Sequence, residues 1–208
     1  MQPRLLAGAA LLATLSALPT RAPAQSTAAV SAGAPAETKW VVDMIHSQVG
    51  FGVRHLVGQV RGTFDRWYAV INTKEGDWKL GTATVSVETA SLNTGNRFRD
   101  ADLRSDRFFA ADRYPRMTFK GTGFAVSDST LDLNGILTIR GKSKPLTLHG
   151  RYRGTAKDAD GRERIGFEAT GTVDRRDFDI SWNESMGGKD LIGNDVEITI
   201  GIEAVRVE

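Results

Sequence analysis

The chain contains no cysteine, only three histidines among its 208 residues, and only one apolar stretch of any length. Without cysteine there are no disulfides, so a stable fold must come from a buried core. There is also no Gly-x-Ser-x-Gly elbow, phosphate-binding loop, His-Glu-x-x-His motif or dinucleotide-binding glycine fingerprint. Many hydrolases carry such a mark, so these absences argue against an enzyme and predict no catalytic residue.

The one apolar stretch, Leu5–Leu18, follows a short basic start and precedes the small-residue sequence Ala22-Pro23-Ala24. This order is typical of a secretory signal peptide, with cleavage after Ala24. The stretch is shorter than the roughly 20 residues that a membrane-spanning helix needs. We therefore expect residues 1–24 to be removed on export to the periplasm, and we expect the mature protein to have no integral membrane segment.

Charge of one sign is also missing once the signal peptide is removed. The leader carries Arg4 and Arg21, two of the 27 basic residues, and none of the 25 acidic residues, so the mature chain is formally neutral. Nucleic-acid-binding domains usually carry a clear basic excess, which argues against nucleic acid as a partner. Residues 25–37 lack large apolar side chains and predict a flexible linker. Residues 38–208 then form the single folded domain.

Within that domain, apolar residues alternate with polar ones, which places them on one face of successive β-strands. Turn sequences such as Asn93-Thr94-Gly95 and Asp160-Gly161 separate the runs. The alternating sets are Val49, Phe51 and Val53; Ala83, Val85 and Val87; Leu131, Leu133, Leu137 and Ile139; Ile165, Phe167, Ala169 and Val173; and Val196, Ile198, Ile200, Ile202 and Ala204.

The pattern predicts an all-β domain of about eight antiparallel strands. Glycines inside the runs let a sheet coil, and they favour a closed barrel over a sandwich. These glycines are Gly50, Gly52, Gly121, Gly123, Gly135 and Gly171. A barrel of eight strands encloses room for side chains or for one small ligand.

One connection breaks the alternation. Residues 96–103 and 105–111 predict two short helices, with Asn96 and Ser105 as their N-caps. Pro115 then restarts extended structure. The connection has an apolar side and is expected to form a lid over the barrel; the apolar residues are Phe98, Leu103, Phe108 and Phe109.

Of the three histidines, His55 shares the inward parity of Val53, whereas His149 falls on the polar side of its strand and is expected to be solvated. An inward histidine is either a hydrogen-bonded core residue or a polar group at the mouth of a pocket. His46 and His55 lack the spacing of metal ligands, so the sequence predicts no metal site.

Short motifs follow one another in a fixed order along the domain. They are Trp40-Val41-Val42-Asp43 with His46-Ser47, Val49-x-Phe51-x-Val53-x-His55, Gly62-x-Phe64, Ser91-Leu92-Asn93-Thr94-Gly95, Arg99-Asp100-x-x-Leu103-x-Ser105, Phe108-Phe109, Tyr114-Pro115 with Phe119-Lys120, Gly135-x-Leu137-Thr138-Ile139-Arg140-Gly141, Arg176-x-Phe178 and Gly193-x-x-Val196. Together these motifs resemble the YceI-like family of bacterial periplasmic proteins. The resemblance extends from Lys39 to Ala204.

The resemblance implies an extended lipocalin-like antiparallel barrel, commonly dimeric, that binds long amphiphiles such as polyisoprenoid chains in its interior. Two positions depart from the family pattern. Asp102 stands where the family usually has histidine, and Asp179 stands where it often has glycine after Phe178. The first departure lies in the expected lid, so no head-group preference is carried over.

The leading hypothesis is a periplasmic carrier of a polyisoprenoid or isoprenoid quinone-like lipid, with no cofactor other than that ligand. The burial of roughly 0.8 kcal/mol per CH₂ would hold such a chain in an apolar tube. The expected wall residues are Phe51, Val53, Val85, Val87, Phe119, Leu137, Phe167 and Trp182. The expected polar groups at the mouth are His46, His55, Arg99 and Asp102.

Two alternatives stay open at the level of sequence. An enzyme acting on a lipid or quinone would use His55 with Asp100 or Asp102 as acid and base. A stress or scaffold protein with a solid core would bind no ligand at all.

Overall fold

The computed structural model describes residues 37–74, 77–127 and 129–207. The predicted signal peptide, and the predicted linker up to residue 36, lie outside the described residues. The first strand, β1, begins at Glu37, one residue before the position expected from composition.

Eight antiparallel strands close into a barrel, as the alternating pattern predicted. The first of them in the chain, β1, is hydrogen-bonded both to β4 and to the last strand, β13, and this double pairing closes the sheet. The barrel strands are β1 (Glu37–Val42), β4 (Trp67–Lys74), β5 (Asp77–Glu88), β7 (Arg116–Ser127), β8 (Thr130–Ile139), β9 (Lys142–Lys157), β10 (Glu163–Asp174) and β13 (Ile192–Val207).

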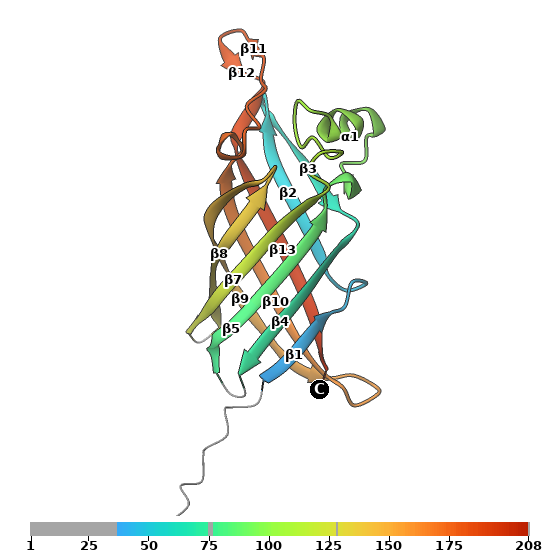
Figure 1. Cartoon of the computed structure of the whole chain (residues 1–208), viewed down its shortest axis with the longest axis vertical. Coiled ribbons are helices and arrows are strands. Elements are labelled where there is room, and N and C mark those ends of the chain that lie inside the picture. Colours follow the sequence, from blue (N-terminus) through green and yellow to red (C-terminus); the bar gives the residue numbers. More distant parts are fainter. Residues whose placement is uncertain (1–36, 75–76, 128, 208) are drawn as a thin grey trace, which may run out of the picture. The chain divides into compact units, whose positions relative to one another are not determined.

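A smaller set of strands extends the sheet towards one end of the barrel. β13 pairs with β1 near its C-terminal end and with β2 (Gln48–His55) along the part between Ile192 and Gly201. β2 pairs with β3 (Gly58–Phe64), and β3 pairs with the two-residue strand β6 (Leu92–Asn93). Figure 1 shows the helix α1 (Arg97–Arg104) and the hairpin β11–β12 (Ser185–Met186 and Lys189–Asp190) at this end, with the C-terminus at the other.

The core lies inside the barrel because the apolar residues of each strand share the inward parity. In β5, Ala83 and Val87 are buried while Thr82 and Thr84 are exposed. In β8, Leu131, Leu133 and Leu137 are buried on the same side. The strand parities read from the sequence are therefore confirmed for these segments.

Two of the strand glycines allow side chains to pack across the interior. Gly121 of β7 lies directly opposite Gly135 of β8 in the sheet register. A Cβ atom at residue 135 would lie 2.5 Å from Cζ of Phe119, and a Cβ atom at residue 121 would lie 2.7 Å from Cδ1 of Leu133. The missing side chains thus leave room for the Phe119 ring and the Leu133 branch at this point of the wall.

The connection predicted as a lid forms one helix instead of two. α1 (Arg97–Arg104) begins at Asn96, whose side chain accepts hydrogen bonds from the backbone N–H groups of Phe98 and Arg99, as predicted. The expected second helix at 105–111 is wrong. That segment forms hydrogen-bonded turns, in which the N–H groups of both Phe108 and Ala110 donate to the carbonyl of Ser105.

We call residues 96–111 the lid segment. It is fixed to the wall, because the Arg104 guanidinium donates to the carbonyl oxygens of Ala90 and Leu92 at 2.8 and 2.7 Å. Arg140 fixes its other end by donating to the Phe108 carbonyl at 2.7 Å and to that of Asp179 at 2.9 Å. None of the helices among the described residues has the length and apolar character needed to cross a membrane.

Candidate ligand-binding site

The barrel interior holds an apolar cavity of about 170 Å³, which we call the inner chamber. Its walls come from β1–β5 and β7–β10, together with β13 and Phe109 of the lid segment. Apart from the hydroxyl of Thr118 and the indole of Trp67, all of its lining side chains are aliphatic, thioether or phenyl groups. A chamber of this composition offers burial and shape to a ligand, and very few hydrogen bonds.

Packed side chains fill the barrel beyond the inner chamber, towards the end where β1 meets β13. Trp40, Ile165 and Ala204 are buried there and share the inward parity, yet none of them lines the cavity. The indole N–H of Trp40 donates to the hydroxyl of Thr73 at 3.1 Å. The cavity therefore extends away from this end, towards α1.

A second cavity of about 350 Å³, the mouth chamber, lies at the α1 end. Phe51, Phe109, Ile139, Val173 and Val196 line both chambers, so the two cavities adjoin one another. The mouth chamber has a mixed wall of apolar side chains from β2, β13 and the lid segment, with the polar groups of His55, Arg99, Asp102 and Arg175 among them. The combined space is apolar along the barrel and polar only near one end.

The structure brings almost all of the predicted ligand-binding residues to these two chambers. The predicted wall residues that line the inner chamber are Phe51, Val85, Val87, Phe119, Leu137 and Phe167. The other two predicted wall residues, Val53 and Trp182, line the mouth chamber. The four predicted lid residues line it as well: Phe98, Leu103, Phe108 and Phe109. Of the predicted polar groups, His55, Arg99 and Asp102 line the mouth chamber and His46 does not.

Trp182 belongs to the mouth and not to a barrel strand. It lies in the segment between the 3₁₀ helix η2 (Arg175–Phe178) and β11. Its ring packs edge-on against Phe108 with centroids 5.4 Å apart, and the guanidinium of Arg107 lies 4.1 Å from the centre of the ring. The same Arg107 forms an ion pair of 2.9 Å with Asp102. Asp102, which departs from the family pattern, is thus neutralised by a neighbour in the lid segment.

Arg175 is the site residue that the sequence analysis missed. The motif was read with Arg176, but Arg176 is exposed and bonded to Asp174, and it is Arg175 that is buried, with 5% exposure. The inward parity of β10 continues through Val173 to residue 175, so the alternation itself contained the signal. The guanidinium of Arg175 is therefore the most deeply buried charge at the mouth.

The contacts of Arg175 are all with neutral acceptors. Its Nε donates to the Gly193 carbonyl at 2.9 Å, and its Nη1 donates to the carbonyls of Ile180 and Trp182 at 2.7 and 2.8 Å. Its Nη2 donates to Oδ1 of Asn194 at 3.3 Å. Burial lowers the pKa of Arg175 from its ordinary value, because the charged form loses its hydration.

His55 ends β2 at the rim of the mouth chamber. It is exposed, and no hydrogen bond to its ring occurs among the described residues. Asp100, one of its proposed partners, is buried elsewhere, where its carboxylate accepts bonds from the backbone N–H and the hydroxyl of Thr94 at 3.0 and 2.5 Å. The acid–base pair of His55 with Asp100 is therefore not assembled in this structure.

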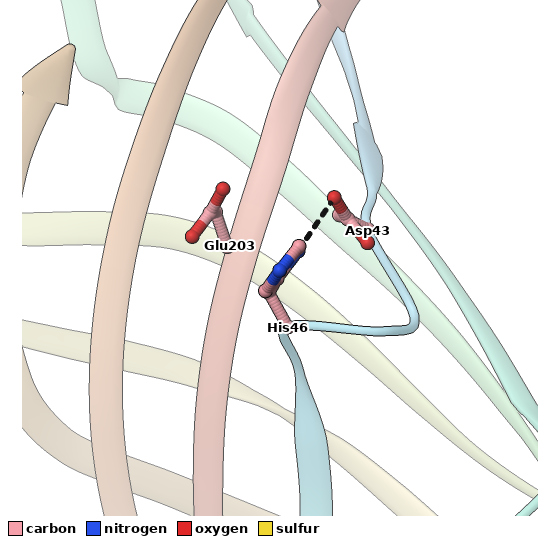
Figure 2. Close-up of side chains that lie close together, drawn as sticks. All are labelled: Asp43, His46 and Glu203. Atoms are coloured by element: carbon pink, nitrogen blue, oxygen red, sulfur yellow. Dashed lines mark hydrogen bonds and ion pairs between the residues drawn. The ribbon is translucent and has the colours of Figure 1, made fainter. Parts of the chain in front are cut away.

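The prediction that His46 lies at the mouth is wrong. His46 lies at the corner between β1 and β2, where its Nδ1 is 3.0 Å from Oδ2 of Asp43. The whole of β2 separates this corner from His55, roughly 25 Å at about 3.3 Å per residue. Figure 2 shows His46 and Asp43 in contact, with Glu203 of β13 close by.

Ligand atoms of Asp43, His46 and Glu203 lie within 4.8 Å of one another, a spacing that a metal ion accepts. Arg164 already neutralises the two carboxylates: its Nη1 lies 2.7 Å from Asp43 and 2.6 Å from Glu203. The guanidinium holds the pKa of Asp43 far below its ordinary value. The cluster lies on the outer face of the barrel, because Arg164 and Glu203 alternate with the buried residues Ile165 and Ala204. We assign it a structural role in joining β1, β10 and β13.

Asp179, the second departure from the family pattern, follows η2 with φ +59° and ψ +27°. This left-handed conformation is the one in which glycine is commonly favoured. The glycine that the family often has here therefore has a conformational cause, and aspartate is among the residues that tolerate this conformation better than most.

A closed eight-stranded antiparallel barrel with an apolar interior and a polar mouth defines the class of lipocalin-like binding barrels. The family within that class follows from comparison: the model of the YceI-like domain matches residues 40–204, and the chain belongs to the YceI-like family. Protein YceI of Salmonella arizonae is 31% identical over 162 residues, which cover 77% of this chain and 82% of that protein.

Solved structures agree with this assignment. The YceI protein of Campylobacter jejuni is 34% identical, with a TM-score of 0.66, over 74% of this chain and 90% of that one. BcnA of Burkholderia cenocepacia has a TM-score of 0.67 at 20% identity, over 78% of this chain and 98% of that one. A polyisoprenoid-binding domain from Saccharophagus degradans has a TM-score of 0.63 at 16% identity, over 81% and 98%. The last two establish likeness of fold alone.

Proposed function

We propose that this protein is a periplasmic carrier that holds the chain of a long amphiphile, such as a polyisoprenoid or an isoprenoid quinone, inside its barrel. The observation that carries the proposal is the inner chamber, whose lining is almost purely apolar and which adjoins a mouth with polar side chains. An apolar tail in the inner chamber and a polar head at the mouth would match this distribution. The family match and the polyisoprenoid-binding domain of similar fold support the ligand class.

Exposed apolar side chains around the mouth support a role in exchange of the ligand. Val57, in the turn between β2 and β3, is fully exposed, Phe98 of α1 is 73% exposed and Met186 of β11 is 54% exposed. All three belong to segments at the same end of the barrel (Figure 1). Apolar residues in such positions allow contact with a lipid surface from which a chain could enter. The predicted signal peptide supports the periplasmic location.

The arrangement supports binding more than catalysis. The enzyme alternative needed His55 and a carboxylate in hydrogen-bond contact, yet Asp100 is held by Thr94 and Asp102 by Arg107. A ligand-free scaffold with a solid core is also disfavoured, because both chambers are empty of side chains.

The test is organic-solvent extraction of the purified protein, followed by mass spectrometry of the extract. A matched pair of variants on β13 makes it specific. Ile198→Trp places an indole in the inner chamber, whereas Thr199→Trp places the same group on the outer face. We expect a co-purifying lipid from the parent protein and from Thr199→Trp, and much less of it from Ile198→Trp. Equal yields from the two variants, or no lipid from any of the three proteins, would contradict the proposal.

A further inference from the structure

The inner chamber ends on a layer of side chains from four neighbouring strands. β4, β1, β13 and β10 follow one another around the barrel. The last residue of each that lines the chamber is, in the same order, Ile71, Val42, Ile202 and Phe167. Two residues further towards the end where β1 meets β13, the next side chain on each strand is buried but does not line the chamber. These four residues, which we call the floor layer, are Thr73, Trp40, Ala204 and Ile165.

Trp40 supplies most of the bulk of the floor layer, because it alone carries an aromatic ring. Its indole N–H donates to the hydroxyl of Thr73 at 3.1 Å, and that hydroxyl donates to the carbonyl of Thr38 at 3.5 Å. All three residues are buried. A buried polar network whose members are hydrogen-bonded holds its side chains in one arrangement. The Trp40 ring is therefore fixed across this end of the barrel.

The depth of the cavity is limited by the floor layer. β13 runs from Ile192, which lines the mouth chamber, to Ile202, which lines the inner chamber just above the floor layer. The strand covers about 33 Å between these residues at about 3.3 Å per residue. With a strand tilt of about 40°, this corresponds to roughly 25 Å along the barrel axis. A chain much longer than this depth has to leave its surplus outside the cavity.

We propose that Trp40 sets the upper limit on the length of the chain that the barrel accepts, by stopping the far end of that chain at the floor layer. This inference rests on the proposed function and adds which chains the barrel selects. An isoprene unit that leaves a bilayer recovers its burial only if it fits into the apolar cavity. Binding from a bilayer should therefore improve with chain length up to the limit and weaken beyond it.

The experiment offers the protein chains that differ in length alone. Phosphatidylcholine vesicles that contain an equimolar series of all-trans prenyl alcohols, from geraniol to solanesol, are incubated with delipidated mature protein. The protein is separated from the vesicles, and mass spectrometry measures each bound alcohol relative to its vesicle content. We expect one preferred length in the parent protein, with the next longer alcohol bound about tenfold less, because its last unit loses burial.

Three variants locate the limit. Trp40→Ala removes the ring and leaves room for about one further isoprene unit, so the ratio of the next longer alcohol to the preferred one should rise about tenfold. Trp40→Leu should shift this ratio in the same direction by less, and it serves if Trp40→Ala does not fold. Trp67→Leu is the matched control, because Trp67 is a buried tryptophan that lines the wall of the inner chamber at the other end of β4 from Thr73. It should change the total amount of bound alcohol and leave the preferred length unchanged.

The outcomes separate the two proposals. If the parent binds the alcohols but the Trp40 variants keep its preferred length, or if the parent has no preferred length, the limit at Trp40 is overturned and the chain-binding function stands. Equal shifts in Trp40→Leu and Trp67→Leu overturn it as well, since the width of the chamber and not its floor would then decide. If Trp40 were merely structural, its variants would lower the melting temperature without changing the ratio of chain lengths. If the parent takes up none of the alcohols, the proposed function fails and this inference fails with it.

Discussion

At the end of the barrel where β1 meets β13, Arg164 contacts the carboxylates of Asp43, Asp158 and Glu203. At the other end, Arg175 and Arg99 contact only neutral acceptors. Side chains fill the barrel at the first end, whereas the second contains a cavity. The difference indicates that the residues of the first end mainly stabilise the fold. The residues of the second end leave a cavity and contribute less to stability.

The largest effect is expected from placing a charge in the inner chamber, because its apolar lining offers the charge almost no hydrogen-bond partner. Val87→Arg should lower the free energy of unfolding by more than about 3 kcal/mol and abolish lipid co-purification, because an unpaired cation is buried. Thr84→Arg, on the exposed face of the same strand, should change stability by less than about 0.5 kcal/mol. Urea unfolding of both variants checks this. Equal damage would mean that the inward face of β5 is misassigned.

Removing Arg164 should have the next largest effect, and it should act on stability alone. Arg164→Met leaves three carboxylates close together without their shared cation, so the free energy of unfolding should fall. The affinity for a prenyl ligand should not change. Arg176→Met, which removes an exposed arginine near the mouth, should lower the free energy of unfolding much less, because exposed ion pairs contribute little. A comparable loss in both variants would erase the proposed difference between the two ends.

Acid should lower the stability of the fold more through the end where β1 meets β13 than through the mouth. Asp43 and Asp174 both have pKa values lowered from 3.8, Asp43 mainly by its hydrogen bond to Arg164 and Asp174 mainly by that to Arg176, which brings Asp174 to about 2. Such a carboxylate contributes stability above its unfolded pKa, and this contribution is lost as the pH falls through the folded value. Stability should therefore fall between about pH 4 and pH 2. Asp43→Asn should flatten this dependence more than Asp174→Asn, as measured by urea unfolding at stepped pH.

The exposed apolar residues offer a matched test that leaves stability unchanged. Val57 lies at the mouth and Ile45 lies at the β1–β2 corner, and both are largely or fully exposed. Val57→Glu should slow transfer of a fluorescent prenyl lipid from vesicles to the protein several-fold, because it removes apolar contact at the rim. The Ile45→Glu variant should take up the lipid from vesicles at the same rate as the parent protein. If the two variants slow transfer equally, the mouth has no special role in loading.

The smallest effect is expected at His55. Because its ring is exposed and has no hydrogen bond among the described residues, His55→Phe should shift the melting temperature by no more than about 1–2 °C. The extracted lipid should change in amount or kind, since His55 borders the head-group region. A clear fall in melting temperature with unchanged lipid would instead make His55 a structural residue.

The strand parities were predictable because each strand has one face that is buried. The alternation of apolar and polar residues was enough to predict that Val85, Phe119 and Leu137 point into the barrel. The lid segment was harder, because its apolar side chains are compatible with either helix or turns. Asn96 caps α1 as expected, but Ser105 ends that helix and starts turns whose contacts come from Arg140, far away in the sequence. Propensity within a short window does not contain such a contact.

His46 and Arg175 show where sequence reasoning about the site failed. His46 lies before β2, at the corner where it contacts Asp43, and is therefore at the opposite end of β2 from His55. Arg175 was passed over because its exposed neighbour Arg176 fits the motif spacing equally well. Only the continued parity of β10 separates the two arginines, and the burial of Arg175 settles which one is the site residue.

The pairing of β1 with β13 also constrains how the protein folds. Lys39 lies opposite Val207, so the barrel closes only when nearly the whole chain is available. Until then β1 and β13 present open strand edges, which are prone to pair with other chains. Contacts between residues so distant in sequence also form slowly, since loop closure must precede them. We therefore expect removal of the last few residues to cause aggregation during refolding, although these residues make no contact at the mouth.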